Sequence, residues 1–333
     1  MQNKQTDTSA DTPRTLVSFL LTYHEQPVQM LKECVESILA LSLRSYEREI
    51  IIVDDGSAES PMPQLMCYGD SVLYVRQKNS GVSVARNTAL RMARGQYVQI
   101  VDGDDKLLSV SYEHCLDIMR HNADTDMVVF DFTTSASAEA TTPPPPVKNS
   151  GTGYMNSSNI RGAACCYLFR RSILGNLVFT PGVNYGEDEE FTPQLLLRAE
   201  TIYVSSVQAY YYRQHSESAT HRRSEEHHRR RLDDTRGVIM RLNTLSATLP
   251  LMERHALQRR VAQLTMDYIY NTIVLTRSRR VLNERLNELR GVGLFPLPAQ
   301  GYTQKYKRFR QLINNPVGRT VLLGALPLMK RER

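Results

Sequence analysis

The chain has 333 residues, 41% of them hydrophobic, and a formal net charge of +6. This length can form one large domain with an appendage, and no apolar run approaches the ~20 residues needed to span a bilayer. The five cysteines form no CxxC pair and no zinc spacing, and no apolar signal segment is visible. We therefore expect reduced thiols and a cytoplasmic protein.

Along the chain, apolar runs alternate with segments of helical spacing. Residues 1–14 are polar and are expected to form a disordered leader. Beyond them, strands that are apolar throughout predict an α/β fold with a mostly parallel, Rossmann-like central sheet covered by helices on both faces. The expected strands are 16–21, 49–53, 72–76, 97–101 and 127–132, and the expected helices are 28–39, 82–93 and 110–120.

The second half of the chain is less regular. Residues 135–153 contain four consecutive prolines and many Ser and Thr, which predicts an irregular surface excursion of polyproline character. We expect a helix within 159–174, a helix at 187–199, short strands at 202–204 and 207–213, and two or three long helices between 225 and 289. The expected domains are 15–220, with halves 15–105 and 106–220, and a helical C-terminal region 221–333.

Three carboxylates lie within four residues at Asp102-Gly103-Asp104-Asp105, directly after an expected strand. Alternate carboxylates at a strand end suit Mg²⁺ or Mn²⁺, and such an ion usually also holds substrate phosphates. The alternative is a polar turn, because Asp and Gly are common turn formers. Ligands of parallel sheets bind at the carboxyl ends of the strands. Thr22-Tyr23-His24 and Asp54-Asp55 also fall at such ends, which favours a ligand site.

Further candidates surround this motif. Asp54 can accept hydrogen bonds from a base or a ribose, with a turn as the alternative. Gly81 begins a helix whose N-terminus favours phosphate, and Arg86 is either a phosphate contact or an ion-pair partner. A second acidic pair, Glu187-Asp188, follows Asp102 by 85 residues. It can supply a general base separate from the metal, or it is a charge pair at a helix N-terminus.

These motifs occur in an order and spacing that resemble glycosyltransferase family 2, a large inverting family with the GT-A fold. The resemblance covers residues 15–220 and makes this part the expected catalytic domain. It is carried by Val17 through Tyr23, Val53 through Ser57, Asn79 through Asn87, Asp102 through Asp105, and Gly186-Glu187-Asp188.

Two departures from the family pattern are visible. Leu21 and His24 stand where the family often has Pro and Asn, which leaves the contacts to the nucleotide edge open. The chain has no Trp and therefore lacks the Gln-x-x-Arg-Trp motif of processive synthases. It resembles a non-processive member of the bacterial polysaccharide type.

The resemblance implies a role for each motif. Asp102 and Asp104 would form the DxD motif that binds Mn²⁺ or Mg²⁺, and Asp54 would hold the base, expected to be uracil. Asp188 would be the catalytic base, and Glu187 would orient it or contact the acceptor. The implied contacts to the nucleotide sugar are Thr22, Tyr23, Asp54, Asp55, Asn79, Gly81, Arg86, Asp102, Gly103 and Arg213.

The expected activity is that of an inverting glycosyltransferase of the hexosyltransferase type. It would move a sugar from a nucleoside diphosphate sugar, expected to be a UDP-sugar, to a hydroxyl group of a glycan or lipid-linked acceptor in cell-surface polysaccharide biosynthesis. The alternatives are a non-catalytic sugar-nucleotide-binding or scaffold protein, and a sugar-1-phosphate nucleotidyltransferase. Nucleic acid is not an expected partner, because the basic residues lack interleaved aromatic residues.

The C-terminal segment offers a further contact. The apolar residues 321–329 are followed by Lys330-Arg331. This segment either lies as a peripheral contact on the anionic inner face of the plasma membrane or packs on the catalytic domain.

Overall fold

The computed structural model describes residues 15–135, 144–214, 224–300 and 302–329. The expected leader at 1–14 lies outside the described residues, as does part of the expected excursion, 136–143. The chain folds into two compact units, each formed by several segments. Unit 1 consists of Met1–Lys148, Cys165–Asn176 and Ile202–Gln214, and unit 2 of Asn149–Ala164, Leu177–Thr201 and His215–Arg333.

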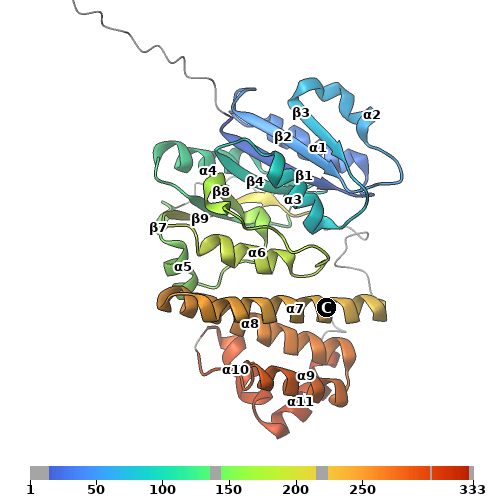
Figure 1. Cartoon of the computed structure of the whole chain (residues 1–333), viewed down its shortest axis with the longest axis vertical. Helices are drawn as coiled ribbons and strands as arrows, with labels where there is room; N and C mark the ends of the chain where they lie inside the picture. Colours follow the sequence, from blue (N-terminus) through green and yellow to red (C-terminus); the bar gives the residue numbers. More distant parts are fainter. Residues whose placement is uncertain (1–14, 136–143, 215–223, 301, 330–333) are drawn as a thin grey trace, which may run out of the picture. The chain divides into compact units, whose positions relative to one another are not determined.

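Unit 1 is built on a nine-stranded sheet with the strand order β3-β2-β1-β4-β8-β6-β9-β5, and β7 pairs with β9 (Figure 1). The strands from β3 to β4 are parallel, and β6 is parallel to β9, whereas β8 runs antiparallel to its neighbours β4 and β6. The strand bounds are β1 Val17–Tyr23, β2 Arg48–Asp54, β3 Val72–Arg76, β4 Tyr97–Asp102, β5 Lys106–Leu107, β6 Met127–Thr133, β7 Val147–Asn149, β8 Tyr167–Arg170 and β9 Ile202–Tyr211.

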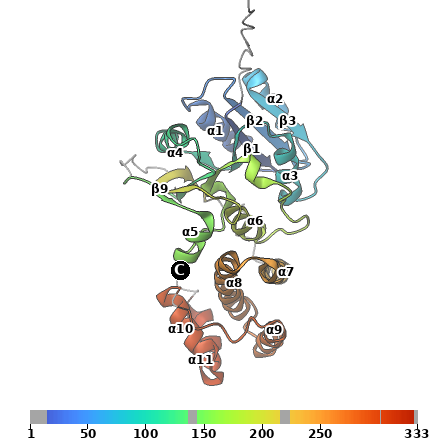
Figure 2. The same cartoon turned by 60° about the vertical axis from the view of Figure 1, so that its left-hand side comes forward.

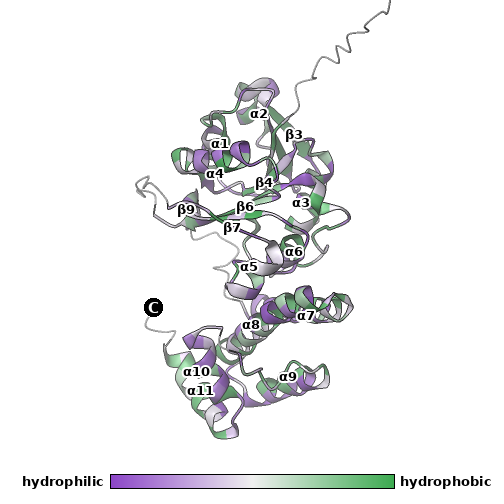
Figure 3. Ribbon diagram, turned by 90° about the vertical axis from the view of Figure 1, so that its left-hand side faces the viewer, coloured by the Kyte–Doolittle hydropathy of each residue, from purple (hydrophilic) through white to green (hydrophobic). Residues whose placement is uncertain are grey.

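The apolar strands form the core of unit 1 because helices cover both faces of the sheet. β1 is buried at all seven of its positions. The first four residues of β6 are also buried, and Figure 3 colours this strand as hydrophobic. Helices α1 and α4 lie on one side of the sheet and α3 on the other (Figure 2). The helices of this unit are α1 Val28–Leu39, α2 Met62–Leu65, α3 Val82–Met92 and α4 Ser109–His121.

The strand order reverses at β1, which has β2 on one side and β4 on the other. Tyr23 lies opposite Asp54, and Thr22 lies opposite Asp102 in the parallel register. Such a reversal leaves a crevice outside the carboxyl ends of the strands, where α/β folds bind ligands. The candidate residues of three separate strands therefore meet at one edge of the sheet.

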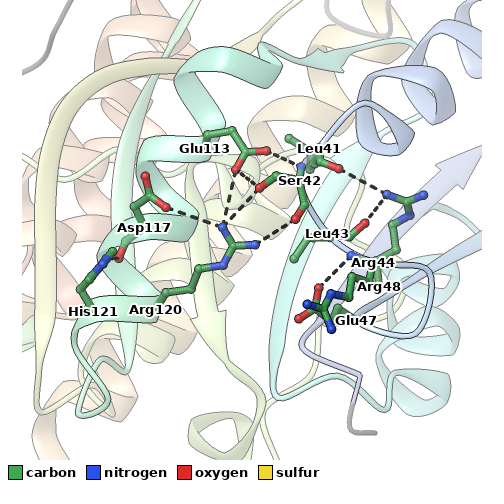
Figure 4. Close-up of polar contacts among 10 residues, drawn as sticks. All are labelled: Leu41, Ser42, Leu43, Arg44, Glu47, Arg48, Glu113, Asp117, Arg120 and His121. Atoms are coloured by element: carbon green, nitrogen blue, oxygen red, sulfur yellow. Dashed lines mark hydrogen bonds and ion pairs between the residues drawn. The ribbon is translucent and has the colours of Figure 1, made fainter.

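The loop that leads into β2 is anchored at the other end of these strands (Figure 4). The Ser42 amide donates to Glu113 Oε1 of α4 over 2.5 Å, and Arg120 Nη2 donates to the Ser42 carbonyl over 3.3 Å. Arg48 Nη1 of β2 donates to the Leu43 carbonyl over 2.9 Å. These contacts fix the start of β2 without using any residue of the candidate site.

Unit 2 is helical. The long helices α7 and α8 lie side by side (Figures 1 and 2), and α5, α9, α10 and α11 pack on α8, while α6 packs on α7. Among the helices of the described residues, none combines the length and apolar character of a membrane-spanning segment. The bounds are α5 Gly151–Ser157, α6 Glu187–Leu196, α7 Glu225–Thr248, α8 Leu251–Thr276, α9 Arg279–Gly291, α10 Gln304–Ile313 and α11 Pro316–Met329.

The elements expected in the first 135 residues are confirmed to within two residues, and three expectations further along are wrong. Residues 159–174 contain strand β8 between two 3₁₀ turns, because Tyr167, Leu168 and Phe169 are buried between two neighbouring strands. Residues 147–153 are not irregular, since β7 and the start of α5 occupy them. The two short strands after residue 201 are one strand, β9, interrupted by a bulge opposite β6. The expected domain boundaries stay predictions.

Candidate active site

The Asp102–Asp105 motif forms a tight turn at the carboxyl end of β4. The Gly103 amide donates to the Thr22 carbonyl over 3.1 Å, and the Asp105 amide donates to the Asp102 carbonyl over 3.0 Å. A Cβ atom at position 103 would lie 2.7 Å from the Thr22 carbonyl oxygen, so the turn requires glycine. The polar turn and the carboxylate cluster are thus the same structure, and the alternatives raised by the sequence do not exclude each other.

Asp102 is held by an arginine of α3. Arg86 Nη2 lies 2.8 Å from Asp102 Oδ1, and the Arg86 side chain is only 5% exposed. The ion-pair alternative therefore describes Arg86 in this structure. The side chain of Asp102 keeps 30% of its surface exposed, so the pair leaves it accessible at the edge of the sheet.

Asp105 faces the interior. Its Oδ2 accepts a 2.7 Å hydrogen bond from the Tyr210 hydroxyl of β9, and its Oδ1 accepts a 2.8 Å hydrogen bond from the Arg213 amide. Burial, together with the charges of Asp102 and Asp104, raises the pKa of Asp105 to about 8. The Tyr210 hydroxyl also accepts a 3.1 Å hydrogen bond from the Asp102 amide. Asp105 thus fixes the turn, and its carboxylate is committed to the fold.

Arg213 joins the segment after β9 to the same turn. Its Nε donates to the Asp104 carbonyl over 2.8 Å, and its Nη2 donates to Glu33 Oε2 over 2.6 Å. The hydrogen bond from Arg213 lowers the pKa of the Glu33 carboxyl. The Arg213 side chain therefore supports the acidic turn by binding the main-chain carbonyl of Asp104. Its predicted contact with the nucleotide sugar stays a prediction.

Asp54 and Asp55 use their carboxylates within the fold. Asp54 is fully buried; its Oδ1 accepts from the Ser57 amide over 2.9 Å and its Oδ2 from the Tyr74 hydroxyl over 2.7 Å. Asp55, at 4% exposure, accepts from the amides of Ser80 and Gly81 over 2.9 and 2.7 Å. These bonds shape the loops at the ends of β2 and β3.

The remaining predicted nucleotide contacts lie at the same edge. Asn79 Nδ2 is 3.2 Å from His24 Nε2, which follows β1, and the Tyr23 hydroxyl donates to the Gln26 carbonyl over 2.8 Å. Gly81 has a φ of 90° and is the N-cap of α3, a conformation that favours glycine. The fold therefore gathers Thr22, Tyr23, Asp54, Asp55, Asn79, Gly81, Arg86, Asp102, Gly103 and Arg213 within unit 1.

The carboxylate oxygens of the Asp102–Asp105 motif fit a metal ion that binds together with a ligand. The described residues contain no group of three or more His, Cys, Asp or Glu side chains arranged to share a metal. Of the carboxylates of this motif, Asp105 is committed to Tyr210 and Arg213, whereas Asp102 keeps 30% of its side-chain surface exposed. Mg²⁺ and Mn²⁺ accept one or two carboxylates and complete their shell with water and substrate phosphates. The site therefore fits a metal held jointly with a diphosphate.

The second acidic cluster opens helix α6 in unit 2. Gly186 is its N-cap in the left-handed region, and Glu187 through Glu190 are four successive acidic residues in the first turn, where the helix dipole favours negative charge. Asp188 Oδ2 accepts from the Ala164 amide over 3.1 Å. Glu189 pairs with Arg260 of α8, and Glu190 pairs with Arg241 of α7.

Three residues of these surroundings escaped the sequence reasoning. Tyr210 lies in an aromatic run of a strand, and nothing in its spacing distinguishes it from a core residue. Arg241 and Arg260 lie in helices rich in basic residues, so their sequence positions resemble those of solvated charges. Only the folded structure brings Arg241 and Arg260 to their partners, Glu190 and Glu189.

Comparison with known proteins shows a family resemblance over part of the chain. Residues 19–177 match the model described as glycosyl transferase family 2. The uncharacterized glycosyltransferase EpsJ of Bacillus subtilis is 28% identical over 216 residues, which are 60% of this chain and 61% of EpsJ. The minor teichoic acid biosynthesis protein GgaB of the same species is 25% identical over 55% of this chain and 21% of GgaB. The matches span less than two thirds of either relative.

Solved structures show the same fold. TarS 1–349 of S. aureus, in complex with UDP-GlcNAc, has a TM-score of 0.62 and 16% identity, with 95% of this chain and 92% of that chain covered. The mannosyltransferase PcManGT of Pyrobaculum calidifontis, in complex with GDP-Man and Mn²⁺, has a TM-score of 0.56 and 13% identity, covering 96% and 88%. The expected GT-A fold with a helical C-terminal part is confirmed. Over residues 19–177, the chain is similar to glycosyltransferase family 2.

Proposed function

We propose that this chain is an inverting glycosyltransferase. It moves a sugar from a nucleoside diphosphate sugar, in the first instance a UDP-sugar, to a hydroxyl group of a glycan or lipid-linked acceptor in cell-surface polysaccharide biosynthesis. The observation that carries the proposal is the carboxylate pair Asp102 and Asp104 at the carboxyl end of β4, beside the end of β1, in a chain that matches this family over residues 19–177. The complexes of two structural neighbours with UDP-GlcNAc and GDP-Man support a nucleotide sugar as the donor.

The donor is proposed to bind along the carboxyl ends of β1, β2 and β4. Thr22 and Tyr23 border the base and Asp54 holds it, while Asp102 contacts the ribose and shares a divalent metal with Asp104. Because Asp54 is fully buried and hydrogen-bonded, its substitution is expected to reduce stability as well as nucleotide binding.

The transfer is proposed to be a single displacement at the anomeric carbon. Asp104 and Asp102 would hold the metal, which would offset the charge of the departing diphosphate. Asp188 takes the proton of the acceptor hydroxyl as its oxygen attacks the opposite face of the sugar, so the configuration inverts. Glu187 orients this base or contacts the acceptor. Two acidic clusters are needed because a metal-bound carboxylate is a poor proton acceptor.

A screen of UDP-, GDP- and dTDP-sugars with Mn²⁺ or Mg²⁺ tests the donor assignment. We expect one nucleotide class to raise the melting temperature only when the metal is present, and to lose its sugar in the presence of an acceptor. Binding without turnover of any donor and acceptor would support the scaffold alternative. Release of pyrophosphate from a nucleoside triphosphate and a sugar-1-phosphate would support a nucleotidyltransferase. No stabilisation by any nucleotide sugar would contradict the proposal.

We also propose peripheral contact with an anionic membrane through α10 and α11. Val317, Val321 and Leu328 are 73%, 54% and 63% exposed and recur at helical spacing, so one face of α11 presents apolar side chains to solvent. The surrounding sequence is rich in basic residues, as expected for a segment at an anionic lipid surface. Residues 289–329 contain no Asp or Glu and six basic residues, Arg290, Lys305, Lys307, Arg308, Arg310 and Arg319.

Vesicle flotation tests the membrane contact. The full chain is expected to float with phosphatidylcholine vesicles that contain phosphatidylglycerol, and less with phosphatidylcholine alone. Val321→Asp should reduce flotation, whereas Val110→Asp on α4, where the valine is 74% exposed, serves as the matched control. Equal flotation of both variants and the parent would contradict the contact. The cytoplasmic location expected from the sequence stays a prediction.

A further inference from the structure

The first turn of α6 concentrates negative charge. Glu187, Asp188, Glu189 and Glu190 are successive, and their negative charges repel one another. The helix N-terminus contributes the equivalent of only about half a positive charge. Further cations are therefore required to hold four carboxylates in one turn, and the structure provides them from α7 and α8.

Arg241 of α7 binds the Glu190 carboxylate with two hydrogen bonds. Its Nε donates to Oε1 over 2.6 Å and its Nη2 donates to Oε2 over 2.7 Å. Glu190 is only 5% exposed, so this bidentate pair is the main compensation for a buried carboxylate. A bidentate pair fixes the orientation of both side chains and not only their charge. Loss of the arginine would leave a buried charge without its partner.

Arg260 of α8 holds the preceding residue, Glu189, through an ion pair with Oε2. Arg260 is 9% exposed and is itself supported, because its Nη1 donates to Gln263 Oε1 over 3.3 Å and Gln263 donates to Asn159 Oδ1 over 2.5 Å. A Cβ atom at Gly162 would overlap the Glu189 carboxylate, so a larger residue at this position would require the Glu189 side chain to shift. The Glu189 carboxylate thus lies directly against Gly162.

Asp188 lies in the turn that these two pairs fix. Its Oδ2 accepts from the Ala164 amide over 3.1 Å, and the Thr192 hydroxyl of the same helix donates to the Gly162 carbonyl over 3.0 Å. The first turn of α6 is therefore anchored to the 162–164 loop, to α7 and to α8. A shift or rotation of the helix would break all three sets of contacts.

We propose that Arg241 and Arg260 are positioning residues for the transfer reaction. They fix the first turn of α6 so that the Asp188 carboxylate keeps one orientation, and they offset the charges of Glu189 and Glu190 beside it. This inference rests on the proposed role of Asp188 as the base. It makes the two long helices of unit 2 part of the catalytic apparatus.

Arg241→Met and Arg260→Met in the full chain test the inference. We expect kcat to fall about 10- to 100-fold in each, because a small displacement of a reacting group has effects of this size. The KM for the donor should not change, since the proposed donor contacts lie on other elements. The acid limb of the pH profile of kcat should move to higher pH. Without an arginine, the carboxylates of Glu187, Glu189 and Glu190 disfavour ionisation of Asp188.

Two variants separate geometry and charge. Arg241→Lys keeps the charge but loses the bidentate geometry, so kcat should fall while the pH profile stays in place. Arg236→Met is the matched control on α7, because Arg236 pairs with Glu288 at the surface, where the two side chains are 38% and 40% exposed. It should leave kcat and the pH profile unchanged.

The double variant Glu190→Gln/Arg241→Met covers the case in which Arg241→Met does not fold. Removal of both charges should restore folding, because no unpaired buried carboxylate remains. The kcat of the double variant should stay below that of the parent, because the bidentate contact is still missing. Wild-type kcat and pH profile in the folded Arg241 and Arg260 variants would overturn the inference. If Asp188→Asn also kept its activity, the proposed function itself would fail. An inactive Asp188→Asn beside normal arginine variants would overturn only the positioning role.

Discussion

The two acidic clusters of this chain are stabilised in different ways. In the turn after β4, Asp105 is held by the Tyr210 hydroxyl and the Arg213 amide, both neutral donors, and burial raises its pKa to about 8. On α6, Glu189 and Glu190 are held by the guanidinium groups of Arg260 and Arg241. In the first cluster an arginine, Arg86, pairs with the half-buried Asp102 and leaves the buried Asp105 to neutral donors, whereas on α6 arginines pair with both residues that follow Asp188.

Among the variants of the turn after β4, we expect Asp104→Asn to have the largest effect. A metal contributes several kcal/mol to the stabilisation of a departing diphosphate, so we expect kcat/KM to fall on the order of 1,000-fold. Calorimetry should also show that donor binding no longer depends on the metal. Asp70→Asn, at an exposed residue before β3, is the control and should have no effect. Turnover within about tenfold of the parent, with intact metal dependence, would speak against Asp104 as a ligand.

Tyr210→Phe tests the neutral support of the first cluster. The variant loses the hydroxyl that donates to Asp105 and accepts from the Asp102 amide, and both partners lose a bond at a fully buried position. We expect the free energy of unfolding to fall by about 1–3 kcal/mol. Urea unfolding measures this change. An unaltered midpoint would show that the hydroxyl does not support the turn.

Tyr268→Phe is the matched control for Tyr210→Phe, and we expect it to have the smallest effect on the free energy of unfolding. Tyr268 of α8 is 1% exposed, and within the described part of the chain its hydroxyl has no hydrogen-bond partner. Loss of this hydroxyl should therefore stabilise the fold by about 1 kcal/mol or leave it unchanged. The same urea titration gives the answer. A destabilisation equal to that of Tyr210→Phe would mean that the loss at Tyr210 reflects the removal of a packed oxygen atom and not of its hydrogen bonds.

The first half of the fold could be predicted because its signals are local. The apolar runs of β1 to β4 differ clearly from the helical spacing between them, and parallel strands imply a shared carboxyl edge. Strand β8 could not be predicted in this way. It lies between β4 and β6 although it follows both in the chain, and its aromatic residues fit a buried helix as well as a buried strand.

The candidate site was predictable as a set of motifs but not as a set of contacts. The sequence indicated Asp102–Asp105 and Glu187-Asp188, since clustered carboxylates are conspicuous. It could not indicate which of them turn inward. Asp105 and Glu190 are committed by partners that follow them by 105 and 51 residues, Tyr210 and Arg241. Such pairings depend on tertiary packing, which no local pattern encodes.

The proposal that one acidic cluster holds the metal and the other supplies the base is tested most directly by Asp188→Asn. Donor binding with metal and sugar transfer should be measured on the same preparation. We expect transfer to fall on the order of 100- to 10,000-fold, the contribution of a positioned base, while the Kd for the donor stays within about twofold, because the metal-binding carboxylates are intact. Near-normal transfer by this variant, or loss of donor binding in parallel with transfer, would contradict the assignment.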